Sequence, residues 1–238
     1  MIIDCIADLH GHYPQLEGGD LLIIAGDLTA SDTPSQYLKF REWLIAQDYR
    51  KKIFVAGNHD GCIESGVFYF SDSWLGAEYL FDSGTQFEGL TIWGTPWTPL
   101  FSGVNHRCKA FMTNELRLHW AFSKIPEGID ILITHGPANG ILDNCISKRR
   151  CGSKSLATNF ERVKPKLHVS GHLHENAGKY TVVEFDNDEY EKDKSCISLN
   201  CSHVNINYDP VNKPVRVVME EIDGDKTFTV RGLCLQKD

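Results

Sequence analysis

The sequence predicts an α/β protein whose strands end in short runs of polar, ligand-type side chains. Apolar runs such as LLIIA at 21–25 and IFVA at 53–56 have the composition of strands that are buried on both faces. Segments of helical period lie between such runs, which is the order expected of an α/β fold. Because ligands gather at the carboxyl ends of strands in these folds, the polar runs mark the place to look for a site.

Length and charge restrict the class of protein. The 238 residues suit one large domain, spanning 1–238, and no segment has the composition of a linker. A formal net charge of −8 argues against long duplex nucleic acid as a partner and favours a small substrate. No run approaches the roughly 20 apolar residues of a membrane span, and the start, MIIDCIADLH, lacks signal-peptide features. We therefore expect a cytoplasmic protein with no membrane partner, whose oligomeric state the sequence leaves open.

The eight cysteines admit two interpretations. A disulfide framework is one, because an even number of cysteines can pair. However, Cys5 lies inside an apolar strand pattern, and no C-x-x-C pair is present to begin a zinc site. We expect most of the cysteines to be buried or free thiols.

The first two expected strands each deliver a carboxylate. Residues 1–7, MIIDCIA, form an apolar run that ends at Asp8, and an extended exit would point Asp8 and His10 the same way. Residues 21–27, LLIIAGD, end in a similar manner at Asp27. About a dozen residues connect the two strands, so we expect no full crossover helix between them.

Three helices are expected from period and capping residues. Pro34 opens the first, 34–47, which places several aromatic and aliphatic side chains on one face. The second, 113–123, has Thr113 as its expected N-cap, and the third, 153–163, has Ser153.

The run GNHD, residues 57–60, follows the strand at 53–56 and is the centre of the expected site. Gly57 permits the turn, Asn58 offers a neutral oxygen, and His59 offers an imidazole that exchanges a proton near pH 7. Alone it would mean little, but ADLHGH, AGDLT, THGP and SGHLH repeat the construction at other strand ends. The donors gathered in this way are Asp8, His10, Asp27, Asn58, His135, His172 and His174.

Seven donors of this kind exceed the needs of one ion. Oxygen and imidazole ligands without thiolate suit Mn²⁺, which we expect first, or Fe, Zn²⁺, Ni²⁺ or Mg²⁺, rather than Cu(I) or Ca²⁺. Two divalent metal ions about 3.5–4 Å apart, bridged by one carboxylate and a hydroxide, would clamp a phosphoester for in-line displacement.

A few residues outside these runs are candidates for contact with substrate. Trp97 and Phe101 lie in an irregular loop, 94–103, where they would either stack on a base or hold the loop in place. Asn105 and His106 follow that loop and are the other candidate substrate contacts.

Other polar residues have a plainer interpretation. Lys148, Arg149 and Arg150 form a basic run that would either hold a phosphate or be a solvated surface. Histidines outside the five runs, His168 among them, are expected to be structural.

The five runs, in the order D-x-H, G-D, G-N-H-D, H and G-H-x-H, resemble the calcineurin-like metallophosphoesterase superfamily. The resemblance implies a double β-sandwich flanked by helices, in four layers α/β/β/α. It also implies that Asp27 bridges the metals and that His59 assists the leaving group. By the same resemblance, Asp8, His10 and His174 are ligands of one metal, and Asn58, His135 and His172 are ligands of the other.

The similarity extends over nearly the whole chain to one branch, the metallophosphoesterase domain-containing (MPPED, fetal-brain 239-like) proteins. It is carried by GDLT, PSQYLKFREWL, GTPWTPLFSG, THGP, RVKPKLHVSGHLHE and NYDPVNKPV. This implies hydrolysis of small phosphodiesters, with 3′,5′- or 2′,3′-cyclic nucleotides first. The charged segment 186–194 looks like an insertion, and Ala30 stands where protein Ser/Thr phosphatases carry a second Asp.

Other functions remain open at this point. One is a phosphomonoesterase or a nuclease acting on nucleic-acid ends, and another is a nucleotide-binding or scaffold protein of low activity. Since none of the expected ligand positions is substituted, we favour the enzyme.

Overall fold

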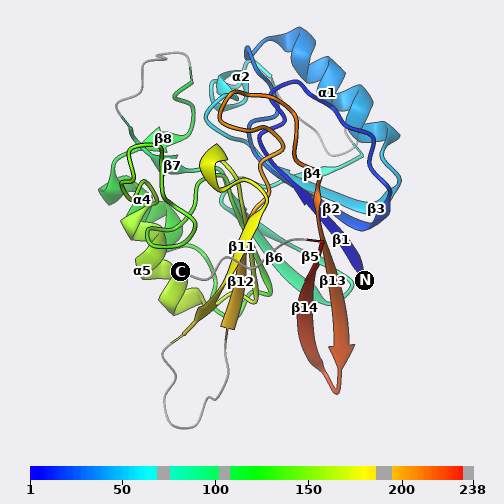
Figure 1. The fold of residues 1–238 in the computed structure, drawn as a ribbon, viewed down its shortest axis with the longest axis vertical. Coiled ribbons are helices and arrows are strands. Elements are labelled where there is room, and N and C mark those ends of the chain that lie inside the picture. Colours follow the sequence, from blue (N-terminus) through cyan, green and yellow to red (C-terminus); the bar gives the residue numbers. More distant parts are fainter. Residues whose placement is uncertain (69–75, 102–107, 186–194, 233–238) are drawn as a thin grey trace.

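The computed structural model describes residues 1–68, 76–101, 108–185 and 195–232, and two six-stranded mixed sheets form its centre (Figure 1). The first sheet has the order β14 (Asp225–Arg231), β13 (Val215–Ile222), β1 (Ile2–Ile6), β2 (Gly19–Ala25), β3 (Tyr49–Val55), β4 (Glu78–Tyr79). The second has the order β11 (Lys179–Glu184), β12 (Ser195–Asn200), β10 (Leu167–Ser170), β9 (Ile131–Thr134), β6 (Leu90–Thr95), β5 (Ser83–Phe87). A short pair, β7 (Thr98–Pro99) and β8 (Met112–Thr113), stands apart.

Helices cover the outer face of each sheet. Helix α1 (Pro34–Ala46) packs on the first sheet, and α4 (Glu115–Phe122) with α5 (Lys154–Val163) packs on the second. A short helix, α2 (Gly61–Glu64), follows β3. The expected α/β fold, a double β-sandwich flanked by helices in four layers, is confirmed.

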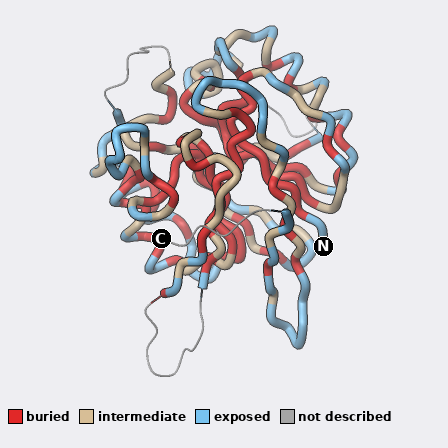
Figure 2. The backbone as a smooth tube through the Cα atoms, viewed as in Figure 1, coloured by how far each residue is buried: buried red, intermediate tan, exposed pale blue. Residues whose placement is uncertain are grey.

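Side chains alternate between the two faces of a strand, which explains why β1 and β2 carry apolar residues on both faces. In β1, Ile3 and Cys5 face the core between the two sheets, whereas Ile6 faces α1. In β2, Ile23 faces the second sheet and Leu22 faces α1. Strands β1 and β2 therefore bury both faces, and the buried segments occupy the middle of the molecule (Figure 2).

The helices form where the sequence predicts them, with one difference at a cap. The side chain of Ser153 accepts a hydrogen bond from Leu156 N, as expected of an N-cap. Helix α4 instead begins after Asn114, whose side chain accepts from Arg117 N. The expected cap Thr113 is wrong because that residue lies in β8.

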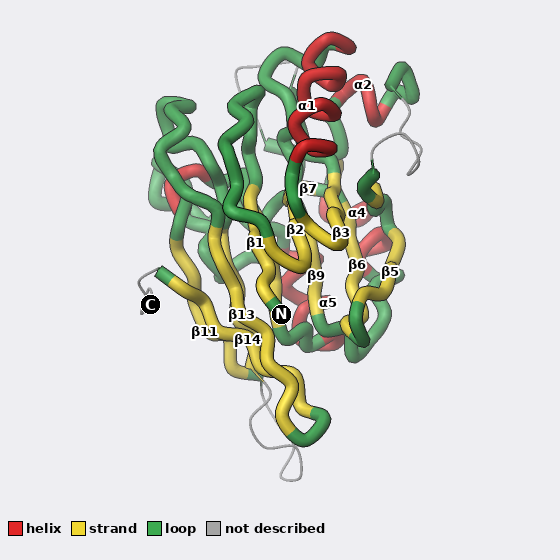
Figure 3. The backbone as a smooth tube through the Cα atoms, turned by 90° about the vertical axis from the view of Figure 1, so that its right-hand side faces the viewer, coloured by secondary structure: helices red, strands yellow, loops and turns green. Residues whose placement is uncertain are grey.

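Parallel strands of both sheets end at the same side of the molecule. Strands β1, β2 and β3 are mutually parallel, as are β9 and β10. A backbone hydrogen bond joins the two ends, since Ala7 N after β1 donates to Cys201 O after β12 at 2.9 Å. Within the second sheet, Gly171 N donates to His135 O at 2.9 Å. The β13–β14 hairpin extends away at the opposite end (Figure 3). As expected, no helix lies between β1 and β2.

The expectation that most cysteines are buried or free thiols is confirmed for the described residues, with one disulfide as the exception. Cys145 and Cys151 form a disulfide, because the loop between them turns back and brings their Cα atoms to 6.1 Å. The other described cysteines are free thiols, as expected: Cys5, Cys62, Cys108, Cys196 and Cys201.

Two further expectations concern the chain as a whole. No helix among the described residues is long and apolar enough to cross a membrane, and the cytoplasmic location stays a prediction. The single domain also stays a prediction, although one apolar core joins the two sheets. The segment 186–194 lies outside the described residues.

The buried His168 gives a testable pH dependence. Its two ring nitrogens lie 2.8 Å from Thr134 Oγ1 and from Ser198 Oγ, and burial lowers its pKa to about 3. The unfolded chain therefore takes up this proton below pH ~6.5 while the folded chain does not, so stability falls as the pH drops from about 6.5 toward 3. We expect a loss of up to about 1.4 kcal/mol per pH unit in that window.

Urea unfolding of the wild type and of His168→Asn between pH 7.5 and 4.5 measures this contribution. The difference in unfolding free energy between the two proteins should shrink as the pH falls. The exposed His119→Asn is the control, and its difference from the wild type should stay constant. A constant difference for His168→Asn would contradict the assignment.

Candidate metal centre and substrate cavity

The carboxylate of Asp27 lies at the middle of the site, just past the end of β2. Its Oδ1 accepts a hydrogen bond from His59 N at 2.8 Å and lies 3.3 Å from His135 Nε2. Its Oδ2 lies 3.6 Å from His10 Nε2 and 4.0 Å from His59 Nε2. Three imidazoles carried by loops of both sheets therefore face one buried carboxylate.

Asp8, His10 and His174 form a second group beside Asp27. The Nε2 atoms of His10 and His174 are 3.4 Å apart, and His174 Nε2 is 3.6 Å from Asp8 Oδ1. These separations are too long for good hydrogen bonds, but ligands at about 2.1 Å from one ion lie roughly 3.0–3.5 Å from each other. Asp8 Oδ1 is also buried without a hydrogen-bond partner among the described residues. The group therefore fits a metal ion.

Asn58, His135 and His172 lie on the other side of Asp27. Asn58 Oδ1 is 2.9 Å from His135 Nε2, and Asn58 Nδ2 donates to Cys108 O, which directs the amide oxygen to the site. His135 Nδ1 lies 2.9 Å from Ala25 O, so its Nε2 is left for a ligand role. The ring of His172 is 4.9 Å from that of His135, between centroids.

The structure thus brings together all seven donors that the sequence indicates. Sets of carboxylate and imidazole atoms within 4.8 Å of one another are Asp8–His10–His174, His10–Asp27–His59 and Asp8–Asp27–His135. His59 belongs to one of them, so distance alone does not separate a ligand role for His59 from a role in proton transfer.

Burial and charge together fix the ionisation of the site. Burial opposes ionisation of Asp8, but the neighbouring imidazole of His174 lowers its pKa to about 2. Burial lowers the pKa of His10 to about 4 and that of His172 to about 3, so both are neutral at pH 7. Burial also acts on His135, but the charge of Asp27 raises its pKa to about 9. Ionised carboxylates and neutral imidazoles are the forms that bind metals, and bound cations would replace the proton on His135.

The backbone around the donors is unusual. Asp8, His10, Asp27 and His172 all have positive φ, from 42° to 67°. The expected extended exit after β1 is therefore wrong, and Asp8 and His10 converge through left-handed turns. Non-glycine residues in this region cost on the order of 1 kcal/mol or more and cluster at functional sites.

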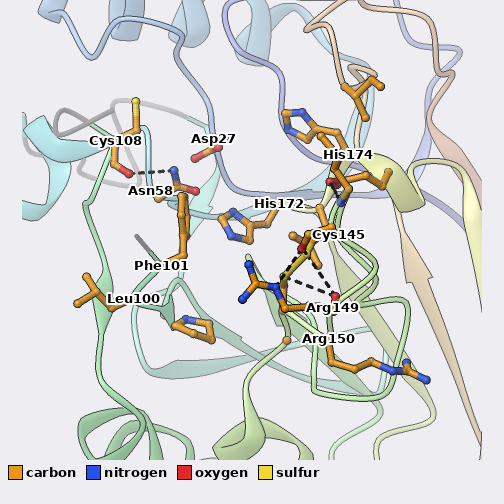
Figure 4. A pocket seen from close by; sticks show the side chains of 18 of the residues that line it. Asp27, Asn58, Leu100, Phe101, Cys108, Cys145, Arg149, Arg150, His172 and His174 are labelled. Atoms are coloured by element: carbon orange, nitrogen blue, oxygen red, sulfur yellow. Dashed lines mark hydrogen bonds between the residues drawn. A yellow bond between two sulfur atoms is a disulfide. The ribbon is translucent and has the colours of Figure 1, made fainter. Parts of the chain in front are cut away.

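A cavity of about 860 Å³ opens over the site, and Asp27, Asn58, His172 and His174 are among the residues that line it (Figure 4). Its other walls include Leu100, Phe101 and Tyr208, together with the loop of the Cys145–Cys151 disulfide. A cavity of this size holds a ligand as large as a nucleotide.

Of the expected substrate contacts that the structure describes, Phe101 lies at this cavity and Trp97 does not. Phe101 lines it, with its ring 5.7 Å from that of His172. Trp97 is not among the residues that line it, because its ring packs against Phe111 and its Nε1 donates to Asp82. Asn105 and His106 lie outside the described residues.

Two residues near the donors were not assigned a role from the sequence. Asp60 is fully buried and accepts from Gly57 N and Leu28 N, so it fixes the loops that carry Asn58 and Asp27. Tyr208 packs edge-on to the rings of His10 and His174. The sequence signal for Asp60 is its position in the run GNHD. Tyr208 comes from a distant loop, and its only signal is its position in the run NYDPVNKPV, which carries the family resemblance.

Fold and site together define a class of protein: a two-sheet α/β sandwich with carboxylate, amide and imidazole donors at the strand ends. The chain belongs to the calcineurin-like phosphoesterase family, whose model matches residues 1–176. This is a family of phosphoester hydrolases that typically use a dinuclear metal centre.

Known proteins support this assignment. The human "Metallophosphoesterase domain-containing protein 1" is 36% identical over an alignment 238 positions long. This alignment covers 89% of this chain and 68% of the relative. The mouse protein of that name gives the same values. The crystal structure of the protein TT1561 of Thermus thermophilus shares the fold at 15% identity, with a TM-score of 0.51 over 72% of this chain and 81% of its own.

Gly57 gives a test of the packing at the centre. Its φ is not positive, so the turn does not require glycine. A Cβ there would instead overlap Asp27 Oδ1 and lie 2.7 Å from His135 Cε1. Gly57→Ala should therefore displace Asp27 and weaken Mn²⁺ binding by at least about tenfold, since the loss of one ligand or its orientation has effects of this size.

Calorimetric titration of the metal-free protein with Mn²⁺ measures the effect. Gly84→Ala, which adds the same methyl group on β5 against Trp93, is the control and should bind Mn²⁺ like the wild type. Equal Mn²⁺ affinity in Gly57→Ala and Gly84→Ala would contradict the close approach of Gly57 to Asp27.

Proposed function

We propose that the protein is a dinuclear-metal-dependent phosphodiesterase that acts on small phosphodiesters, with 3′,5′- or 2′,3′-cyclic nucleotides first. The observation that carries the proposal is the convergence of carboxylate and imidazole donors on both sides of Asp27 at the floor of a nucleotide-sized cavity. The net charge of −8 supports a small substrate, rather than a long duplex or a membrane, as the partner.

The donors divide into two sets that share Asp27. Asp8, His10 and His174 would hold one ion, and Asn58, His135 and His172 the other. Two divalent ions, Mn²⁺ first, would supply the positive charge that offsets the phosphoester and would lower the pKa of water for attack on phosphorus. Asp27 lies against both sets of donors, because its Oδ2 faces His10 of one set and its Oδ1 faces His135 of the other.

His59 is the residue proposed to give a proton to the leaving oxygen. Its backbone N–H is held by Asp27 Oδ1, and its Nδ1 lies 3.4 Å from both Ala30 O and Cys108 Sγ. This leaves Nε2 on the side of the cavity, which His59 lines. The ring is only partly exposed, so its orientation is restricted.

Hydrolysis of paired ester substrates tests the function. The Mn²⁺-loaded protein should hydrolyse bis-p-nitrophenyl phosphate faster than p-nitrophenyl phosphate, and chelation should abolish both reactions because it removes the ions that would activate water and offset the charge of the reacting phosphate. Cyclic nucleotides with either ring should also be hydrolysed. Faster hydrolysis of the monoester would indicate a phosphatase, and no hydrolysis at all would favour a nucleotide-binding protein.

The role of His59 is tested by metal content and rate together. His59→Ala should keep both metals and lose kcat by about 10²–10⁴-fold on a nucleoside ester, because it removes the proton donor. The loss should be smaller on a p-nitrophenyl ester, whose leaving group needs little protonation. His12→Ala, an exposed histidine of the first polar run, is the control.

Metal content by elemental analysis and kcat on both esters separate the roles. If His59→Ala lost a metal, His59 would be a ligand. An equal loss of kcat on the two esters would make it a general phosphate contact.

A further inference from the structure

The loop 143–152 forms the wall of the cavity that faces the metal centre, and it is anchored at several points. The Cys145–Cys151 disulfide closes it, and Lys148 N donates to Cys145 O at 2.7 Å to form a tight turn. Ile146 N donates to Glu175 Oε1 at 2.8 Å, which ties the loop to the residue that follows His174. The loop is therefore held in place relative to the candidate metal ligands.

The two arginines of this loop differ in their partners. Arg150 Nη1 forms an ion pair at 2.8 Å with the buried carboxylate of Asp143, which neutralises its charge. Arg149 donates from Nε to Ser147 Oγ at 3.3 Å, and among the described residues its guanidinium makes no ion pair. Figure 4 shows Arg149 directed toward His172, whereas Arg150 is directed away.

Neighbouring groups do not cancel the charge of Arg149. Asp27 and Glu175 are the carboxylates among the described residues that line the cavity, and neither forms an ion pair with Arg149: Asp27 faces His135 and Glu175 accepts from Ile146 N. The cavity wall also includes Phe101 and Ile146, which are apolar and cannot satisfy a guanidinium. A guanidinium of this kind favours a planar or tetrahedral oxyanion, to which it donates two parallel hydrogen bonds.

We propose that Arg149 forms a second anion-binding position in the cavity, and that the substrate is a small nucleotide carrying a phosphate besides the one that is hydrolysed. This rests on the proposed function for the reacting phosphate. The exposed ring of Phe101, which lines the same cavity 5.7 Å from the ring of His172, suits the nucleoside.

Kinetics on matched cyclic nucleotides test the position. We expect the wild type to hydrolyse adenosine 2′,3′-cyclic phosphate with an added 5′-phosphate at about tenfold higher kcat/KM than the same compound without it, mainly through KM, because a charge-assisted contact of this type has that magnitude. Arg149→Gln should remove this preference. Lys148→Gln removes the same charge from the neighbouring residue, which does not line the cavity, and should keep it.

Binding provides a readout that does not depend on turnover. In the Mn²⁺-loaded proteins, calorimetry should show adenosine 3′,5′-bisphosphate binding about tenfold tighter than adenosine 5′-monophosphate to the wild type and to Lys148→Gln, and equally tightly to Arg149→Gln. If no ester were hydrolysed but this pattern held, the proposed reaction would fail and the second position would stand.

Three results would overturn the second position. One is a wild type that shows no preference for ligands with the additional phosphate. Another is an Arg149→Gln variant that keeps this preference unchanged. The third is an equal loss for both ligands in Arg149→Gln, which would place the guanidinium on the reacting phosphate instead.

Discussion

The buried carboxylate of Asp27 is the constraint on which the rest of the site depends. An ionised carboxylate that is 2% exposed needs hydrogen bonds or opposite charge, since burial alone would disfavour it. The groups that meet this need come from loops after β1, β3 and β9, and β9 belongs to a different sheet from the other two. The two sheets must therefore pack face to face, with their parallel strands ending at one edge, before the charge of Asp27 is compensated.

The layered core makes this arrangement rigid enough to hold strained turns. Strands β1, β2 and β9 bury apolar side chains on both faces, and β10 buries Leu167 and Val169 between the sheets, so their ends cannot shift without opening the core. The left-handed conformations of Asp8, Asp27 and His172 each oppose folding, and the packed strands before them offset that cost. The same tight geometry explains Gly57, which has no room for a side chain beside Asp27.

Sequence reasoning predicted those features that depend on local pattern. Apolar runs ending in Asp8, Asp27 and Asn58 predicted strands and donors at one edge, and the motif order indicated the family. The disulfide was missed because spacing does not reveal whether a loop turns back to bring Cys145 to Cys151. For Trp97 the sequence left two roles open, and the structure supports the one in which it holds the loop: an aromatic side chain in an irregular loop has no period, so its direction is set by its partners Phe111 and Asp82. Tyr208 reaches the centre from the far end of the chain, beyond any local signal.

The distribution of charge explains how an acidic chain can favour small anions and still oppose long ones. The net charge of −8 is a property of the whole surface, and its repulsion acts on a polyanion that lies along that surface. A small ligand inside the cavity responds mainly to nearby groups, because screening at physiological salt limits exposed charges to about 8 Å. There, two divalent ions would exceed the two carboxylates of Asp8 and Asp27 in charge, and Arg149 of the loop 143–152 adds a further positive group to the lining. Local positive charge within a negative surface would thus select anions by size, which is the selectivity that the proposed hydrolysis of small nucleotides requires.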